Sequence, residues 1–126
     1  MTVVVDASAV LTILNEEPGM TVVVEVLPLA VIGAVNISEA VAKLADGGMP
    51  GPEIQEAIEG LRLDVVPFDA ELALAAGLLR PLTRLAGLSL GDRACLALGM
   101  RLHVPVLTAD RSWAGLDLDV EVRLLR

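Results

Sequence analysis

Two adjacent segments decide the fold class: residues 89–103 read SLGDRACLALGMRLH, and residues 104–110 read VPVLTAD. Apolar residues recur at helical spacing in the first segment, and Ser89 with Asp92 has the three-residue spacing of a capping box at a helix start. The second segment contains a short apolar run, Pro105–Leu107, that predicts a strand running into Thr108 and Asp110. A helix followed at once by a strand is typical of an α/β protein.

The same alternation extends toward the N-terminus. Apolar runs predict strands at residues 2–5, 30–35, 63–66 and, after the segments above, 120–124, with helices at 8–15, 20–29, 36–47, 52–61 and 69–87. Ser8 is expected to cap the first of these helices, and Pro81 to kink or split the last. The helix at 20–29 is the ambiguous one, because Val22-Val23-Val24 fits a strand equally well. Regular alternation predicts right-handed crossovers and a three-layer α/β/α sandwich with a central, mainly parallel sheet, formed by a single domain over residues 1–126.

The composition restricts the class of protein. Of the 126 residues, 55% are hydrophobic, which is enough for a sizeable core without disulfides. The net charge of −8 argues against binding of nucleic acid through electrostatic attraction by the whole protein surface. That objection weakens if several acids converge on a bound cation, because the metal then reverses the local field.

Nothing in the sequence predicts insertion into a membrane. The longest apolar stretch, residues 26–35, contains Pro28 and Gly33 and falls short of the roughly 20 residues that a spanning helix needs. The valine run at the N-terminus has neither a basic region before it nor a cleavage-site pattern after it. Cys95 is the only cysteine and cannot form an internal disulfide. We therefore expect a cytoplasmic protein.

Four acidic residues are expected to meet at one edge of the sheet. Asp6 and Asp110 follow predicted strands, whereas Glu39 and Asp92 fall in the first turns of predicted helices. The carboxyl ends of parallel strands and the N-termini of the crossover helices lie at the same edge, where α/β proteins bind ligands. Four neighbouring carboxylates repel one another and favour a hard cation such as Mg²⁺ or Mn²⁺, an ion that activates water for attack on a phosphodiester.

Each acid also has a purely structural interpretation. Asn36 with Glu39, and Ser89 with Asp92, have the spacing of capping boxes, and acids in a first helical turn are favoured by the helix dipole in any case. An aspartate at the end of a buried strand can serve as a turn residue. The sequence leaves these alternatives open.

Three motifs support a more specific hypothesis: residues 4–9 (VVDASA), Ser38-Glu39 at the start of an Ala- and Leu-containing helix, and residues 90–97 (LGDRACLA) followed closely by 104–113 (VPVLTADRSW). The last pair at this spacing is the most specific part. Through these motifs, and from end to end, the sequence resembles PIN-domain ribonucleases of the VapC toxin family, which belong to type II toxin–antitoxin systems.

The resemblance implies an acidic catalytic cluster of Asp6, Glu39, Asp92 and Asp110, with the three aspartates as ligands of Mg²⁺ or Mn²⁺. It further implies that the hydroxyls of Ser8 and Thr108 orient the carboxylates or the bound water. The expected activity is hydrolysis of RNA phosphodiesters. The expected partners are an RNA substrate, a cognate antitoxin and a second copy of the chain.

Other residues are interpreted mainly as structural. Trp113 is expected to be a packing anchor, Cys95 a core residue and His103 a residue of a helix end. Four arginines are candidates for phosphate contacts or for ordinary surface roles: Arg80, Arg84, Arg93 and Arg111. The alternative function is a catalytically silent PIN-fold module for binding or assembly. A phospho-acceptor receiver is disfavoured because it needs a late lysine, whereas the only lysine is Lys43.

Overall fold

A five-stranded, all-parallel sheet lies at the centre of the protein, as seen in a computed structural model that describes residues 1–126. The strands are β1 (Val3–Val5), β2 (Ala30–Gly33), β3 (Asp64–Val66), β4 (Val106–Thr108) and β5 (Val122–Leu124), in the order β3-β2-β1-β4-β5. Every neighbouring pair is parallel, and Val4 of β1 is in register with Val31 on one side and Val106 on the other. The prediction of an α/β fold with a mainly parallel sheet is confirmed.

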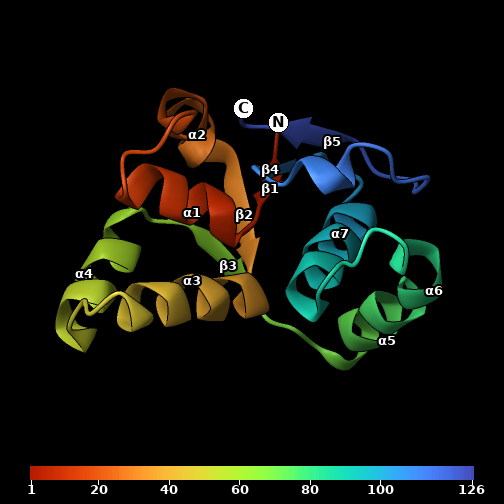
Figure 1. Cartoon of the computed structure of the whole chain (residues 1–126), viewed down its shortest axis with the longest axis horizontal. Coiled ribbons are helices and arrows are strands. Elements are labelled where there is room, and N and C mark those ends of the chain that lie inside the picture. Colours follow the sequence, from red (N-terminus) through yellow and green to blue (C-terminus); the bar gives the residue numbers. More distant parts are fainter.

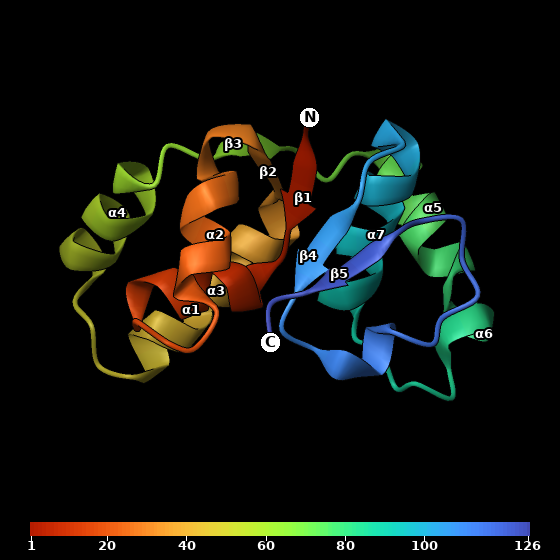
Figure 2. The same cartoon turned by 90° about the horizontal axis from the view of Figure 1, so that it is seen from above.

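Helices cover both faces of this sheet (Figures 1 and 2). They are α1 (Ala7–Leu14), α2 (Met20–Val26), α3 (Ala34–Asp46), α4 (Gly51–Gly60), α5 (Ala70–Leu78), α6 (Arg80–Thr83) and α7 (Leu90–Leu102), with short 3-10 helices η1 (Leu27–Leu29) and η2 (Arg111–Trp113). In Figure 1, α1 to α4 lie on one side of the strands and α5 to α7 on the other, which is the predicted three-layer sandwich. None of these helices combines the length and apolar character needed to span a lipid bilayer.

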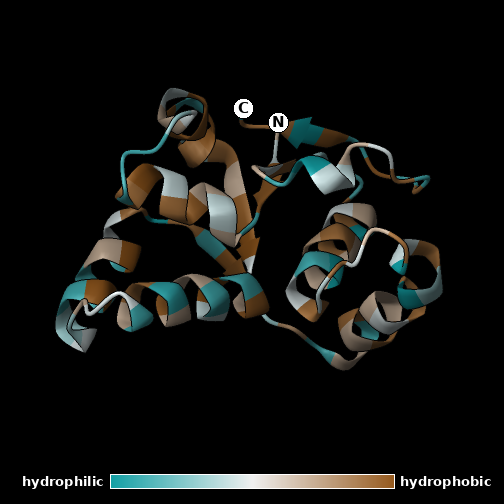
Figure 3. Ribbon diagram, in the orientation of Figure 1, coloured by the Kyte–Doolittle hydropathy of each residue, from teal (hydrophilic) through white to brown (hydrophobic).

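Two hydrophobic clusters form the core, one on each face of the sheet. Val4 packs with buried residues of α5 and α7, whereas Val3 and Val5 pack with buried residues of α1 and α2. Side chains alternate between the two faces of a strand, so a run of valines satisfies both clusters. The inner strand β2 is accordingly brown in Figure 3, whereas the edge strand β5, which contains Arg123, is largely teal. Cys95 and Trp113 are fully buried, as predicted for core residues.

The structure resolves the ambiguous segment around Val23 in favour of the predicted helix. In α2 only Val23 is buried, while Val22 and Val24 are exposed by 36% and 46%. The segment belongs to the connection between β1 and β2, which are adjacent and parallel and therefore need a crossover. Pro81 splits the region after residue 69 into α5 and α6, as predicted.

Two predicted helix starts are wrong. Asp6, and not Ser8, caps α1, because the Asp6 carboxylate accepts a hydrogen bond from the backbone N–H of Ala9 and the helix begins at Ala7. The next correction concerns α3, which begins at Ala34 directly after β2, with no side-chain cap. Glu39 therefore lies beyond the first turn of its helix, and the Asn36–Glu39 capping box does not form.

The strand order places a topological switch point beside β1. From β1 the chain proceeds outward to β2 and β3, and it then returns to the other side of β1 to form β4 and β5. The segments that leave β1 and β4 thus diverge at the carboxyl edge of the sheet. In parallel sheets such a divergence opens the crevice in which ligands bind.

Candidate functional site

A cavity of about 300 Å³ lies at this switch point. Its lining residues come from the ends of β1 and β4 and from helices α1, α3 and α7: Asp6, Ala7, Ser8, Glu39, Lys43, Asp92, Ala109 and Asp110. All four acids singled out from the sequence line it. The structure therefore brings together side chains that are far apart along the chain.

Asp6 is the most firmly held of the four acids. Its side chain is buried, with 6% of the residue exposed. The Ser8 hydroxyl donates to Oδ1 at 2.5 Å, the Ala9 N–H donates to the same oxygen at 3.1 Å, and the Thr108 hydroxyl donates to Oδ2 at 2.6 Å. Burial raises the pKa of Asp6, the negative charge of Asp92 adds to this, and the three hydrogen bonds oppose it. The fold thus keeps this carboxylate in one orientation.

The two hydroxyls also connect β1 to β4. Ser8 Oγ accepts a hydrogen bond from the N–H of Ala109 at 2.9 Å, and Thr108 Oγ1 accepts one from the N–H of Asp110 at 3.0 Å. Each hydroxyl therefore donates to the Asp6 carboxylate and accepts from a backbone N–H at or next to Asp110. This geometry is what a role in orienting the carboxylates requires.

Glu39 is held by a residue that the sequence had marked only as a cap. Asn36 is 1% exposed, and its Nδ2 donates to Glu39 Oε1 at 2.9 Å and to the carbonyl oxygen of Gly91 at 3.0 Å. The amide thereby joins α3 to α7. The three-residue spacing to Glu39 was the available signal, since within a helix it places both side chains on one face.

Gly91 provides the space in which the Glu39 carboxylate lies. A Cβ atom built on Gly91 would overlap the carboxylate carbon and both of its oxygens. Burial raises the pKa of Glu39, the Asn36 hydrogen bond opposes this, the charges of Asp92 and Asp6 raise it further, and the charge of Lys43 lowers it. Glu39 is therefore confined close to other negative charges.

Asp92 and Asp110 each use one carboxylate oxygen locally. Asp92 Oδ2 accepts from the Ser89 N–H at 2.9 Å in the predicted capping box, which is present. Asp110 Oδ1 accepts from the N–H and the hydroxyl of Ser112, at 2.9 and 2.7 Å. The capping interpretation of Asp92 is thus correct, yet its other oxygen remains without a protein donor, as does that of Asp110.

The carboxylate oxygens of the cavity are the type of ligand that a hard divalent cation prefers. Glu39, Asp92 and Asp110 each keep one oxygen without a protein donor, and Asp6 Oδ2 accepts only from the Thr108 hydroxyl, which leaves a lone pair for a cation. Oxygen ligands are those that Mg²⁺ and Mn²⁺ prefer. No three acidic, histidine or cysteine side chains lie close enough together to enclose one ion as they stand. Glu39 and Asp92 are partly exposed and Asp110 is exposed, so their side chains are accessible to an ion that enters the cavity.

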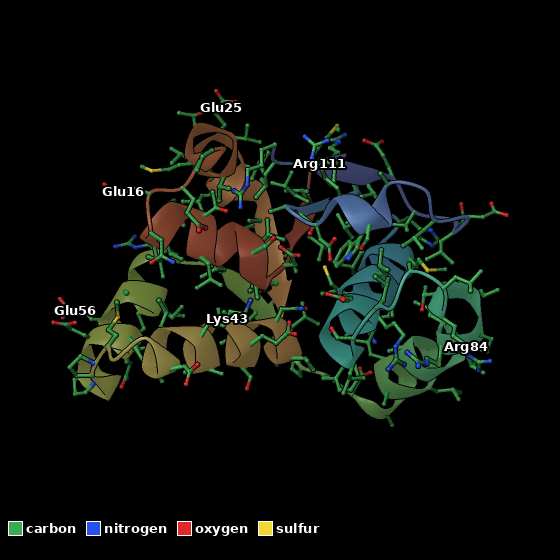
Figure 4. The ribbon with its side chains drawn as sticks, viewed as in Figure 1. Glu16, Glu25, Lys43, Glu56, Arg84 and Arg111 are labelled. Atoms are coloured by element: carbon green, nitrogen blue, oxygen red, sulfur yellow. The ribbon has the colours of Figure 1, made fainter.

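The arginines considered for phosphate contacts do not line the cavity. Arg80 and Arg93 donate to the carbonyl oxygens of Leu88 and Ala76, at 3.5 and 3.0 Å. In Figure 4, Arg84 lies beside α6 and Arg111 points outward near β5. Proximity in sequence to a candidate ligand therefore does not place these side chains at the site. The basic residue that does line the cavity is Lys43, on α3 one turn after Glu39.

His103 has a structural role, as expected. It is the C-cap of α7 and adopts the left-handed conformation, with φ of 55°. It lines a separate pocket together with Val104 and Pro105, which precede β4. The acid cavity lies beyond the other end of that strand.

Comparison with known proteins supports the fold over the whole chain. The structure is similar to DNA-bound VapBC from Salmonella typhimurium (TM-score 0.78, 16% identity, 100% of this chain and 99% of that chain). It is also similar to a toxin–antitoxin complex from Klebsiella pneumoniae (0.77, 15%, 99% and 98%) and to VapBC-1 from nontypeable Haemophilus influenzae (0.75, 18%, 99% and 98%). No curated protein sequence matches the chain. The PIN domain family model matches residues 3–117, which is most of the sequence, and the protein therefore belongs to the PIN domain family.

Proposed function

We propose that this protein is a divalent-metal-dependent endoribonuclease and the toxin of a VapBC-type toxin–antitoxin pair. The observation that carries the proposal is the convergence of four carboxylates from separate elements on one cavity at the topological switch point. Membership of the PIN domain family and similarity to structures described as toxin–antitoxin complexes support it.

Asp6, Asp92 and Asp110 are the residues proposed to hold Mg²⁺ or Mn²⁺. When bound, such an ion supplies an activated water and stabilises charge that develops on a phosphodiester. Asp6 contributes a fixed orientation, because Ser8 and Thr108 donate to its two oxygens. Glu39 is held by Asn36 at Oε1, which leaves Oε2 to accept a proton from the attacking water.

Two protein partners belong to the proposal. A segment of an antitoxin would occupy the acid cavity and block it. A second copy of the chain would cover the exposed leucines of α5, α6 and the turn after α6, namely Leu74, Leu78, Leu82 and Leu85. Light scattering tests this dimer: Leu82→Glu should yield a folded monomer, and an unchanged mass would contradict the assignment of this surface.

Cleavage of RNA tests the activity. The protein should cut a structured RNA in the presence of Mg²⁺ or Mn²⁺, and cleavage should stop in chelator or with Asp6→Ala. Asp117→Asn, a substitution of an acid outside the cavity, serves as the control and should cleave like the wild type. Activity that persists in chelator or in Asp6→Ala would overturn the proposal.

Metal binding separates the nuclease from a catalytically silent PIN-fold module. Selective binding stabilises the folded state, so Mn²⁺ should raise the melting temperature of the wild type and have much less effect on Asp92→Asn. A protein that neither responds to Mn²⁺ nor cleaves RNA would favour the silent module.

A further inference from the structure

A second cavity adjoins the acid cavity. It has a volume of about 470 Å³ and lies between α1 and α3 and the turns that follow them, with Glu17 and Arg126 also among its lining residues. Ser8 and Lys43 line both cavities, so the two adjoin at these residues, and we call the second cavity the α1–α3 groove. Lys43 stands at the junction.

Lys43 is a positive charge without an ion pair in a strongly negative setting, and from one helical turn away its charge lowers the pKa of the Glu39 carboxyl. It is exposed, and its ammonium group forms no ion pair within 4.0 Å, since the ion pairs of this protein are Arg101 with Asp69 and Arg123 with Glu121. In Figure 4 its side chain rises from α3 toward α1. The only lysine of the chain is therefore the basic residue that borders all four acids.

An RNA strand needs such a charge beside the acids. A protein with a net charge of −8 repels the phosphate backbone, and a cation held by the acids would compensate this only at the phosphate that it contacts. An ammonium group on a flexible stem can bind a neighbouring phosphate as a mobile point charge.

We infer that Lys43 binds the phosphate next to the scissile one, and that the α1–α3 groove carries this part of a single-stranded RNA. The inference rests on the proposed nuclease function and assigns its substrate path. A single strand is favoured because its nucleotides can enter a groove individually, whereas an A-form duplex presents a wide, shallow surface. Lys43 is thus a substrate-positioning residue, with no part in the bond cleavage.

Kinetics with a single-stranded RNA oligonucleotide test the inference. Lys43→Ala should raise KM about tenfold, the effect of losing one hydrogen bond to a charged group, and should change kcat much less. The slope of log KM against log salt should fall by about 0.7, the value for one phosphate contact on a single strand. Lys43→Arg should restore most of the affinity. Arg84→Ala, which removes an exposed cation outside both cavities, should behave like the wild type.

Binding measurements separate this inference from the proposed function. Fluorescence anisotropy of the same RNA with Mn²⁺ requires no cleavage. If RNA binding depends on Lys43 but no RNA is cleaved, the α1–α3 groove is supported as the RNA path and the proposed nuclease activity is overturned. If Lys43→Ala cleaves RNA with an unchanged KM and an unchanged salt slope, the assignment of the groove to RNA is overturned and the nuclease activity stands. Loss of binding to a hexaglutamate peptide in Lys43→Ala, with RNA binding unchanged, would assign the groove to a protein partner and also overturn the inference.

Discussion

Replacing Gly91 with alanine should displace the Glu39 carboxylate from the site, although no acidic residue is itself substituted. The added Cβ would overlap the Glu39 carboxylate, which lies at the end of a flexible side chain and must therefore move away. Movement breaks the hydrogen bond of 2.9 Å from Asn36 Nδ2. We expect kcat for RNA cleavage to fall nearly as far in Gly91→Ala as in Glu39→Ala.

The expected stability change follows from two opposing contributions. A glycine-to-alanine change within a helix stabilises it by up to about 1 kcal/mol, and Gly91 is the second residue of α7. Loss of a hydrogen bond to a charged group costs about 1.5–3 kcal/mol. The net effect is a destabilisation of about 0.5–2 kcal/mol, which leaves the domain folded and makes a loss of activity interpretable.

Two control variants separate the effect of the overlap with Glu39 from the effect of adding a methyl group to a helix. A Cβ added at Gly77 in α5 would meet no neighbouring atom within 4 Å, so Gly77→Ala should show only the stabilising contribution of about 1 kcal/mol. In a Glu39→Ala background the carboxylate is gone, and Gly91→Ala should likewise stabilise. The coupling energy between positions 39 and 91 should therefore reach about 1.5–3 kcal/mol in a double-mutant cycle measured by urea unfolding. Additivity within about 0.5 kcal/mol, together with wild-type cleavage by Gly91→Ala, would show that the added Cβ does not displace the Glu39 carboxylate.

Three further predictions concern buried and half-buried groups of the protein. Thr108→Val removes the hydroxyl that donates to Asp6, and should destabilise the protein by about 1–3 kcal/mol in urea unfolding and lower kcat; unchanged values would contradict its role. Burial in the folded state raises the pKa of Asp6 above 3.8 and that of Glu39 above 4.5. At a pH between the unfolded-state pKa and the raised folded-state pKa of each group, the folded state therefore binds more protons than the unfolded chain. In chelator, the free energy of unfolding should therefore fall as pH rises through this window, and Asp6→Asn should flatten the slope. Burial raises the pKa of the Cys95 thiol well above its usual range, so Ellman's reagent at about pH 8 should react only after unfolding, and rapid native reaction would contradict the burial.

Local signals account for the parts of the fold that the sequence predicted well. Ser89 and Asp92 cap α7 through a contact confined to one turn, and Pro81 interrupts a helix through its own ring. The valines of β1 occur where a strand buried on both faces must be apolar. In each case the residues that decide the structure lie within a few positions of one another.

Long-range contacts decided the parts that were predicted wrongly or missed. The helix start at Asn36 was misplaced because β2 ends at Gly33, where it stops pairing with its neighbours, and α3 follows at once. Asn36 then contributes to the site through the carbonyl of Gly91, 55 positions away. The sequence left open whether the arginines contact phosphate or have ordinary structural roles. For Arg80 and Arg93 the carbonyl oxygens of Leu88 and Ala76, on other segments of the chain, show a structural role.

The sequence alone determined the α/β class, the order of the elements and the identity of the acids, because periodicity and strand-end position are properties of the chain itself. Only the tertiary structure decided which groups surround those acids. The buried Asp6 receives its hydrogen bond from Thr108 across 102 positions, and Lys43 comes to border the cavity because α3 packs between α1 and α7. Orientation and local charge arise from packing, and packing joins residues that no spacing along the sequence connects.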